Sequence, residues 1–176
     1  EAGHSYVPMA TATPSLTLRA LLSPAASKVG LDKSAMVTAG LTPAAKALPA
    51  VTTARASAGV TLLVVPTDKD VEQMVADARF FWSAMEGASE YAVEHAVLPF
   101  PSHQVDPYRG MTPHFRVTSA RARALHAAAT LRSDKGQALR PGQTARPGQV
   151  GSLLIIASAA AVLPRVSSPA RLKQAS

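Results

Sequence analysis

The 176-residue sequence contains no cysteine, so it can form neither a disulfide framework nor a thiolate metal site. No stretch reaches the roughly 18 uninterrupted apolar residues of a membrane-spanning helix, and no basic segment followed by an apolar run indicates a secretory signal. We therefore expect a cytoplasmic chain with no membrane partner. Because the first residue is Glu1 rather than Met, we further expect a piece of a longer gene product.

Acidic residues are missing from the carboxyl-terminal quarter of the chain. All 11 acids lie at or before Asp134, whereas residues 135–176 contain six Lys or Arg residues. A basic segment of this kind can bind phosphate backbones, but this one also lacks the aromatic side chains that stack on bases. Two interpretations stay open, a solvated linker with a terminal flap or a nucleic-acid-binding segment.

Composition divides the chain into three parts. Residues 1–38 are rich in Pro, Ala, Ser and Thr, so we expect a disordered N-terminal segment with one short helical candidate at 15–22 that Pro24 ends. Residues 39–166 form the single expected domain, interrupted at 131–150 by a polar, flexible insertion that repeats Arg-Pro-Gly-Gln. Residues 167–176 are a tail.

Three apolar runs in the domain predict buried strands, at 60–65, 96–100 and 153–156. The first is continuous, as in a strand of a parallel sheet that is buried on both faces, and Pro99 in the second indicates a strand end or an edge. Helical segments between the runs predict an α/β fold, with a mostly parallel sheet and helices on both faces. With only three convincing strands, we also expect exposed sheet edges and poor solubility.

The helical segments differ in the strength of their signals. Thr67 and Asp70 form a capping box before a helix with a regular apolar stripe, which should end at Gly87. The segment 43–58 favours a helix, although Pro49 predicts a kink or a late start near Val51. A short helix is expected at 158–163.

A further helix should begin with Thr112 as cap and Pro113 in the first turn, and it carries Arg116, Arg121 and Arg123. These arginines are interpreted either as a solvated face or as a surface for an anion or an acidic partner.

The segment Gly40-Leu-Thr-Pro-Ala-Ala-Lys46-Ala47 has the spacing of the phosphate loop G-x-x-x-x-G-K-[ST]. Ala45 replaces the second glycine, which lets backbone amides wrap the phosphates, and Ala47 replaces the hydroxyl residue that binds magnesium. An ATPase also needs an acid on a later strand, and none follows Asp134. We therefore expect a degenerate loop, no bound cofactor and no hydrolysis, with a weak nucleotide-binding module as the alternative.

No other catalytic or metal-binding pattern is complete. The loop 101–112 should lie at the carboxyl end of a strand, where open α/β sheets bind ligands, and it contains His103 and Asp106 together with Tyr108 and Arg109. No serine lies in a G-x-S-x-G turn, and no two histidines have the i, i+4 spacing of a zinc helix. We expect neither catalytic residues nor a metal site.

Four segments of the chain resemble the N-terminal module of bacterial transcription-repair coupling factors, a module that is itself similar to the excision-repair protein UvrB. They are Gly40–Leu48, Leu62–Pro66 with the following helix, the region from Phe100 to Leu125, and Leu153–Ile156 followed by Val162–Val166. The most specific part is the spacing of five residues in the third segment: Pro107, Tyr108, Pro113, His114 and Arg121. The resemblance covers about residues 40–131 and 151–166.

This resemblance implies a partial helicase-like (RecA or P-loop-like) domain that has lost ATP hydrolysis and acts as a scaffold in transcription-coupled nucleotide excision repair. The parent family is an ATP-dependent DNA translocase, so ATP is a cofactor of the parent only. UvrA, RNA polymerase and DNA would be partners through domains absent here, and this piece would contact the rest of its own chain. The chain departs from the family at His103–Asp106, where the family has Trp-Glu-Thr-Leu, and at Arg109, where it has Asp.

Overall fold

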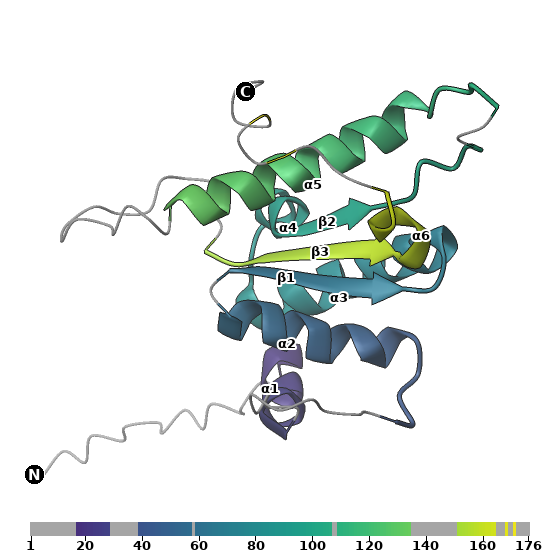
Figure 1. The fold of residues 1–176 in the computed structure, drawn as a ribbon. Coiled ribbons are helices and arrows are strands. Elements are labelled where there is room, and N and C mark those ends of the chain that lie inside the picture. Colours follow the sequence, from purple (N-terminus) through teal and green to yellow (C-terminus); the bar gives the residue numbers. More distant parts are fainter. Residues whose placement is uncertain are drawn as a thin grey trace, which may run out of the picture.

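The computed structural model describes residues 17–28, 39–57, 59–106, 109–134, 151–164, 168 and 171 (Figure 1). Its elements in chain order are α1 (Leu18–Lys28), the 3-10 helix η1 (Ala44–Lys46), α2 (Ala47–Ser57), β1 (Val60–Val65), α3 (Asp68–Glu86), α4 (Glu90–Ala96), β2 (Val97–Phe100), α5 (Phe115–Asp134), β3 (Leu153–Ser158) and α6 (Ala159–Val162).

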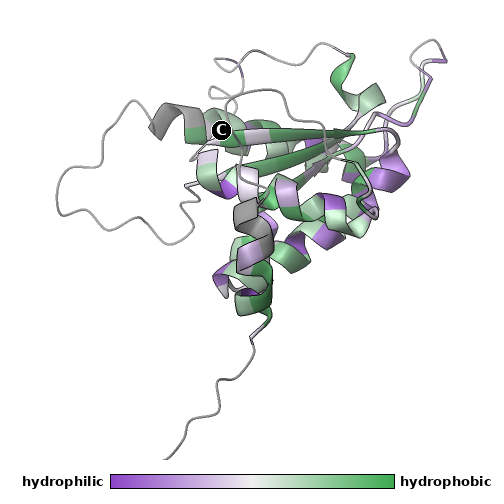
Figure 2. Ribbon diagram, turned by 90° about the horizontal axis from the view of Figure 1, so that it is seen from below, coloured by the Kyte–Doolittle hydropathy of each residue, from purple (hydrophilic) through white to green (hydrophobic). Residues whose placement is uncertain are grey.

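The three strands form one parallel sheet in the order β1-β3-β2. Val60 of β1 pairs with Leu153, and Val97 of β2 pairs with Leu154. All six residues of the central strand β3 are buried, and the strands stand out as the most uniformly hydrophobic elements (Figure 2). The predicted parallel α/β sheet is therefore confirmed, and β2 with its Pro99 is an edge strand as expected.

Helices cover both faces of the sheet, as the sequence predicts. On one face, α2, α3 and α4 bury the larger core, in which Leu154 and Ile156 of β3 meet Val51 and Trp82. On the other face, α5 and α6 bury Leu153, Ile155 and Ala157 of the same strand. The alternation of β3 side chains between the two cores explains why this strand is a continuous apolar run.

Strand β1 departs from the prediction of burial on both faces. Val60, Leu62 and Val64 are 44%, 54% and 48% exposed, whereas Leu63 packs against the larger core and Val65 is buried. The reason is that α5 lies mainly over β2 and β3, so one face of β1 has no covering helix among the described residues. Three apolar side chains of β1 are therefore exposed in a row on one face of the sheet.

Helix α3 agrees closely with its sequence signals. The Thr67 hydroxyl accepts a hydrogen bond from the Asp70 amide, and the Asp70 carboxylate accepts one from the Thr67 amide, at 3.3 and 3.0 Å. Gly87 ends the helix in the left-handed conformation, with φ of 63°, which glycine adopts without steric cost. The apolar stripe predicted for this helix is buried at Val71, Met74, Val75, Ala78, Trp82 and Met85.

Three local predictions about helices are corrected. Helix α1 continues through Pro24 to Lys28, and Leu22 anchors it on the larger core. Helix α2 begins at Ala47 instead of near Val51, because Pro49 lies in the first turn, where a backbone N–H has no intrahelical partner to lose. Helix α4 was not predicted at all, although Ser89 caps it by accepting a hydrogen bond from the Ala92 amide.

Other predictions fall partly or wholly on residues outside those described. The disorder expected for 1–38 lies outside them at 1–16 and 29–38, whereas 18–28 form α1. The insertion expected at 131–150 begins as the last turn of α5, and its residues 135–150 are not described. Of the tail at 167–176, only residues 168 and 171 are described.

The exposed row on β1 generates a prediction about self-association. Leu62→Thr should reduce concentration-dependent association, measured by sedimentation velocity, because it removes the most exposed apolar side chain of the row. The free energy of unfolding should change by less than about 0.5 kcal/mol. The matched variant Leu63→Thr, on the core face of the same strand, should lose about 2 kcal/mol. Equal association of Leu62→Thr and the unaltered chain would contradict this assignment.

Candidate functional site

The carboxyl ends of the three strands meet at one edge of the sheet, as the parallel topology requires (Figure 1). Asp68 follows β1 at the start of α3, Ser102 follows β2, and Ser158 ends β3. Arg121 reaches this edge from α5. We call these four residues the carboxyl-end cluster. Open α/β sheets bind their ligands at this edge, so the cluster is the first candidate for a functional site.

Asp68 joins the segment after β1 to the loop after β2. Its Oδ1 accepts a hydrogen bond of 2.8 Å from the Ser102 amide, and its Oδ2 accepts one of 2.5 Å from the Ser102 hydroxyl. The loop curls around this contact, because the Gln104 amide donates to the Ser102 hydroxyl oxygen at 3.2 Å and Gln104 has a φ of 58°. A left-handed backbone at a residue other than glycine is uncommon, so the loop has a specific local shape.

Arg121 joins the loop after β2 to α6, which follows β3. Its guanidinium donates to the carbonyl oxygens of Pro101 at 2.7 Å and Ala161 at 3.3 Å, and it lies 4.0 Å above the centre of the Phe100 ring. Only 5% of Arg121 is exposed. A buried guanidinium needs such acceptors to offset its loss of hydration. The interpretation of Arg121 as part of a solvated or anion-binding face is therefore wrong, because its donors point into the protein.

The ionisation of Asp68 and Arg121 is coupled. Burial alone would raise the pKa of Asp68, but the hydrogen bonds from the hydroxyl and the amide of Ser102 oppose it, and the pKa lies below its ordinary value. Burial lowers the pKa of Arg121, and attraction to the Asp68 carboxylate opposes that change. Asp68 is therefore a carboxylate and Arg121 a cation at neutral pH.

The degenerate phosphate loop at Gly40–Lys46 does not have the geometry of a phosphate cradle. Its last three residues are η1, which leads into α2, and the described residues contain no strand ahead of it. The Ala45 amide donates to the Thr42 hydroxyl at 3.2 Å, and the Lys46 amide donates to the Thr42 carbonyl at 3.2 Å. These amides already have partners within the loop, and Lys46 is exposed.

The five residues of the family motif do not come together as a site in the described part of the chain. Pro107 and Tyr108 lie outside the described residues. Pro113 is half-buried and His114 is exposed just before α5, whereas Arg121 is buried two turns further along the helix.

The loop 101–112 follows β2 at the carboxyl edge, as predicted, but His103 and Asp106 are not a catalytic pair. Asp106 forms an ion pair of 3.3 Å with Arg109. The Nδ1 atom of His103 is buried and has no hydrogen-bond partner. An acid engaged by arginine is poorly placed to orient an imidazole for proton transfer.

Other polar groups give no second candidate. Within the described ranges, no group of three or more His, Asp or Glu residues could hold a metal ion, and no helix is long and apolar enough to cross a membrane. A shallow hollow of about 210 Å³ lies between α3 and α4. Its Arg79 donates to the Val97 carbonyl at 3.3 Å and lies 3.8 Å from the Glu94 carboxylate, so this cation already has acceptors.

Sequence reasoning missed most of the carboxyl-end cluster. No motif in the sequence marks Asp68, Ser102 or Ser158 as a site residue. The available signal was position, because each residue stands at or just beyond the end of a strand, where parallel topology brings side chains together. Chemically, the cluster can hold three chain segments in place through the hydrogen bonds of Asp68 and Arg121, whereas the buried hydroxyl of Ser158 has no hydrogen-bond partner among the described residues.

The chain matches no model of a protein family, no curated protein and no solved structure in comparisons with all three.

Replacement of Arg121 provides the clearest test of the cluster. Arg121→Met keeps much of the side-chain volume but removes the donors to Pro101 and Ala161, so their two carbonyl oxygens lose a hydrogen-bond partner. We expect the free energy of unfolding in urea to fall by about 3 kcal/mol. Arg123→Met, at an exposed position of the same helix, should change it by less than about 0.5 kcal/mol. Similar losses in both variants would contradict the structural role of Arg121.

The lowered pKa of Asp68 predicts the direction of acid destabilisation. Since the carboxylate form is stabilised only in the folded state, its contribution is present above the unfolded-state pKa of about 4 and is lost as pH falls through the lower folded-state value. Asp68→Asn should therefore be less stable than the unaltered chain at pH 7, and the difference should shrink below about pH 4. Urea unfolding at pH 7, 5 and 3 measures this, and a constant difference would rule out the carboxylate as its source.

Proposed function

We propose that the chain is a non-catalytic N-terminal scaffold of a transcription-repair coupling factor and acts in transcription-coupled nucleotide excision repair. The proposal rests first on the family resemblance of the segments around Gly40–Lys46, 62–66, 100–125 and 153–166. In this proposal the fold is a partial helicase-like domain, and its parent chain supplies the ATP-driven translocase together with the surfaces for UvrA, RNA polymerase and DNA.

The observation that carries the non-catalytic part is the state of the Gly40–Lys46 loop. A phosphate cradle needs free amides and a lysine aimed at the phosphates. Here the amides of Ala45 and Lys46 donate to Thr42. The loop also lacks the second glycine, which would let backbone amides surround a phosphate, and the hydroxyl residue, which would bind magnesium. This favours a vestigial loop over the alternative of a weak nucleotide-binding module.

The scaffold role is supported by the carboxyl-end cluster. At the edge where a nucleotide-binding relative would bind its ligand, Asp68 and Arg121 are committed to Ser102, Pro101 and Ala161. An edge closed by internal hydrogen bonds holds its strands in fixed positions without a ligand. A scaffold requires that property.

The proposal predicts a repair phenotype for the whole gene product in cells that make it. Deletion of residues 39–164 should abolish the faster removal of ultraviolet lesions from the transcribed strand of an induced gene, while repair of the other strand continues. Lys46→Ala should leave the strand difference unchanged, because the loop is vestigial. Strand-specific lesion mapping over time measures both.

Two outcomes would count against this proposal. A deletion strain that keeps the strand difference would remove the role in coupled repair. Loss of the difference in Lys46→Ala, combined with micromolar binding of an ATP analogue to the purified chain that the same substitution abolishes, would replace it with the nucleotide-binding module.

A further inference from the structure

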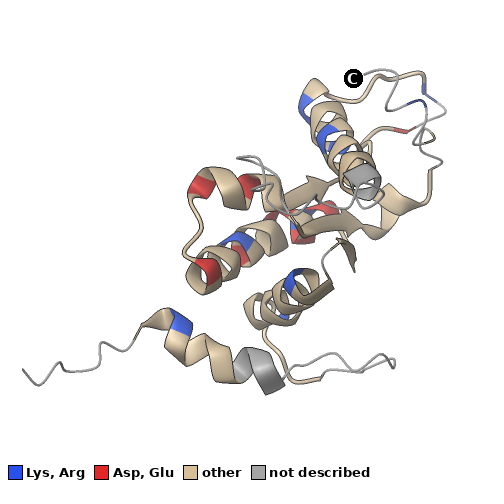
Figure 3. Cartoon of the chain, turned by 90° about the vertical axis from the view of Figure 1, so that its left-hand side faces the viewer, with Lys and Arg blue, Asp and Glu red and all other residues tan. Residues whose placement is uncertain are grey.

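Charge is divided between two sides of the molecule. Acidic residues are concentrated on α3 and α4, whereas the charged residues in the coloured part of α5 are all basic (Figure 3). Over the described residues 109–131 there are four arginines and no acid. The α5 side is therefore where an anionic partner would be attracted.

The exposed arc of α5 combines cations with an aromatic residue. Phe115 is 67% exposed and its ring lies 4.8 Å from that of His114, centre to centre, with the planes inclined by 37°. Arg116 and Arg123 are seven residues apart, so they lie on the same side of the helix, and both are exposed. Neither arginine takes part in an ion pair among the described residues.

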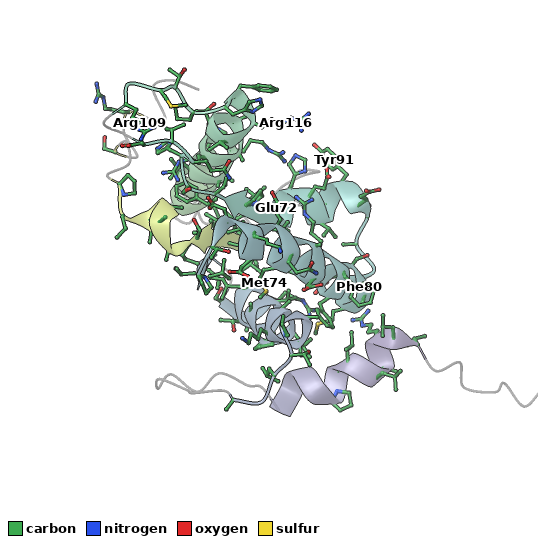
Figure 4. All side chains as sticks on the ribbon, turned by 90° about the vertical axis from the view of Figure 1, so that its right-hand side faces the viewer. Glu72, Met74, Phe80, Tyr91, Arg109 and Arg116 are labelled. Atoms are coloured by element: carbon green, nitrogen blue, oxygen red, sulfur yellow. The ribbon has the colours of Figure 1, made fainter. Side chains whose placement is uncertain are left out.

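The rest of this arc is small or polar. Its other exposed members are Thr118, Ser119, Ala122, His126 and Thr130. Arg121 is excluded from the arc because it is buried. Arg109 lies in the loop before α5, at the same end of the molecule as Arg116 and away from Phe80, but it pairs with Asp106 (Figure 4). The free cations of the arc are thus Arg116 and Arg123.

We infer that this arc binds single-stranded nucleic acid, with Phe115 and His114 as a stacking platform and Arg116 and Arg123 as contacts to backbone phosphates. An exposed aromatic ring beside unpaired arginines is the combination that sequence-independent single-strand binding uses. Duplex DNA offers phosphates but no open base face, and an acidic peptide offers charge but no base. The presence of the exposed ring therefore selects the single strand. This surface goes beyond the scaffold role and does not depend on it.

Binding through the α5 arc can be distinguished from binding through the basic segment 135–176, because only the arc has an aromatic residue. That segment has no aromatic residue, so it could attract phosphates only by charge. If the segment alone bound nucleic acid, substitution of Phe115 would have no effect. The two surfaces therefore give different results in one binding assay.

The chain supplies matched controls for both residue types. Tyr91 on α4 is 65% exposed and stacks on His95 at 4.2 Å, as Phe115 does on His114, but it lies among acidic residues. Arg19 is an exposed arginine on α1. Because all of these positions are exposed, the variants should melt at the same temperature as the unaltered chain, which is checked first.

The binding experiment uses the full chain and a fluorescein-labelled 20-nucleotide oligo(dT), followed by anisotropy between 50 and 200 mM salt. Phe115→Ala should weaken binding by about tenfold, the value of one base stack, and Tyr91→Ala should have no effect. Loss of two phosphate contacts in Arg116→Ala/Arg123→Ala should make the slope of log affinity against log salt shallower by about 1.4. Arg19→Ala should leave the slope unchanged.

A second measurement tests stacking directly. Phe115→Trp should show quenched emission when oligo(dT) is added, whereas Tyr91→Trp should not, and the native Trp82 is buried in both. Absence of oligo(dT) binding, equal binding by Phe115→Ala, tighter binding to a 20-base-pair duplex or equal binding to polyglutamate would each overturn the inference. Tighter binding to oligo(dT) with the expected losses in the variants would establish it.

Discussion

The described structure depends on one constraint, that three chain segments leaving the same edge of a parallel sheet must be held together. Parallel strands do not connect through short hairpins, so their carboxyl ends are not fixed by turns. Asp68 supplies the link between β1 and β2 through two hydrogen bonds to Ser102, and Arg121 supplies the link between β2 and β3 through the carbonyls of Pro101 and Ala161. The carboxyl-end cluster thus replaces the turns that an antiparallel sheet would have.

The same constraint explains how the two charged groups at this edge are used. A buried cation and a carboxylate lose hydration, and each regains stability only when its hydrogen-bonding groups find partners. Once Arg121 and Asp68 are satisfied by the chain itself, they are not available to a ligand. Phe115, Arg116 and Arg123 lie away from this edge, on the exposed arc of α5.

Helix placement determines the other surface properties. Because α5 lies over β2 and β3, the outer face of β1 keeps Val60, Leu62 and Val64 exposed. All-parallel sheets are normally covered on both faces, so this row is unusual for the fold class. The sequence of β1 does not predict this exposure, since an apolar run has the same composition whether or not a helix covers the second face of the strand.

The sequence predicted correctly those features that depend on contacts between residues close together in the chain. The capping box of Thr67 and Asp70, the apolar stripe of α3, Gly87 at its end and the six-residue run of β3 were all readable, because backbone periodicity and capping are local properties. Pro24 and Pro49 were misread, because a proline signals a missing donor but does not say where the helix begins or what packs on it.

The sequence by itself determined the α/β class and the parallel strands, and it showed that Gly40–Ala47 lacks the second glycine and the hydroxyl residue of the phosphate-loop pattern, since these follow from composition and spacing. Only the tertiary structure decided that Arg121 is buried while Arg116 and Arg123 are exposed. These three arginines lie within eight residues of one helix and differ only in which side of it faces the sheet. Similarly, Asp68 and Ser102 are 34 residues apart, and only the folded sheet brings carboxylate and hydroxyl within 2.5 Å.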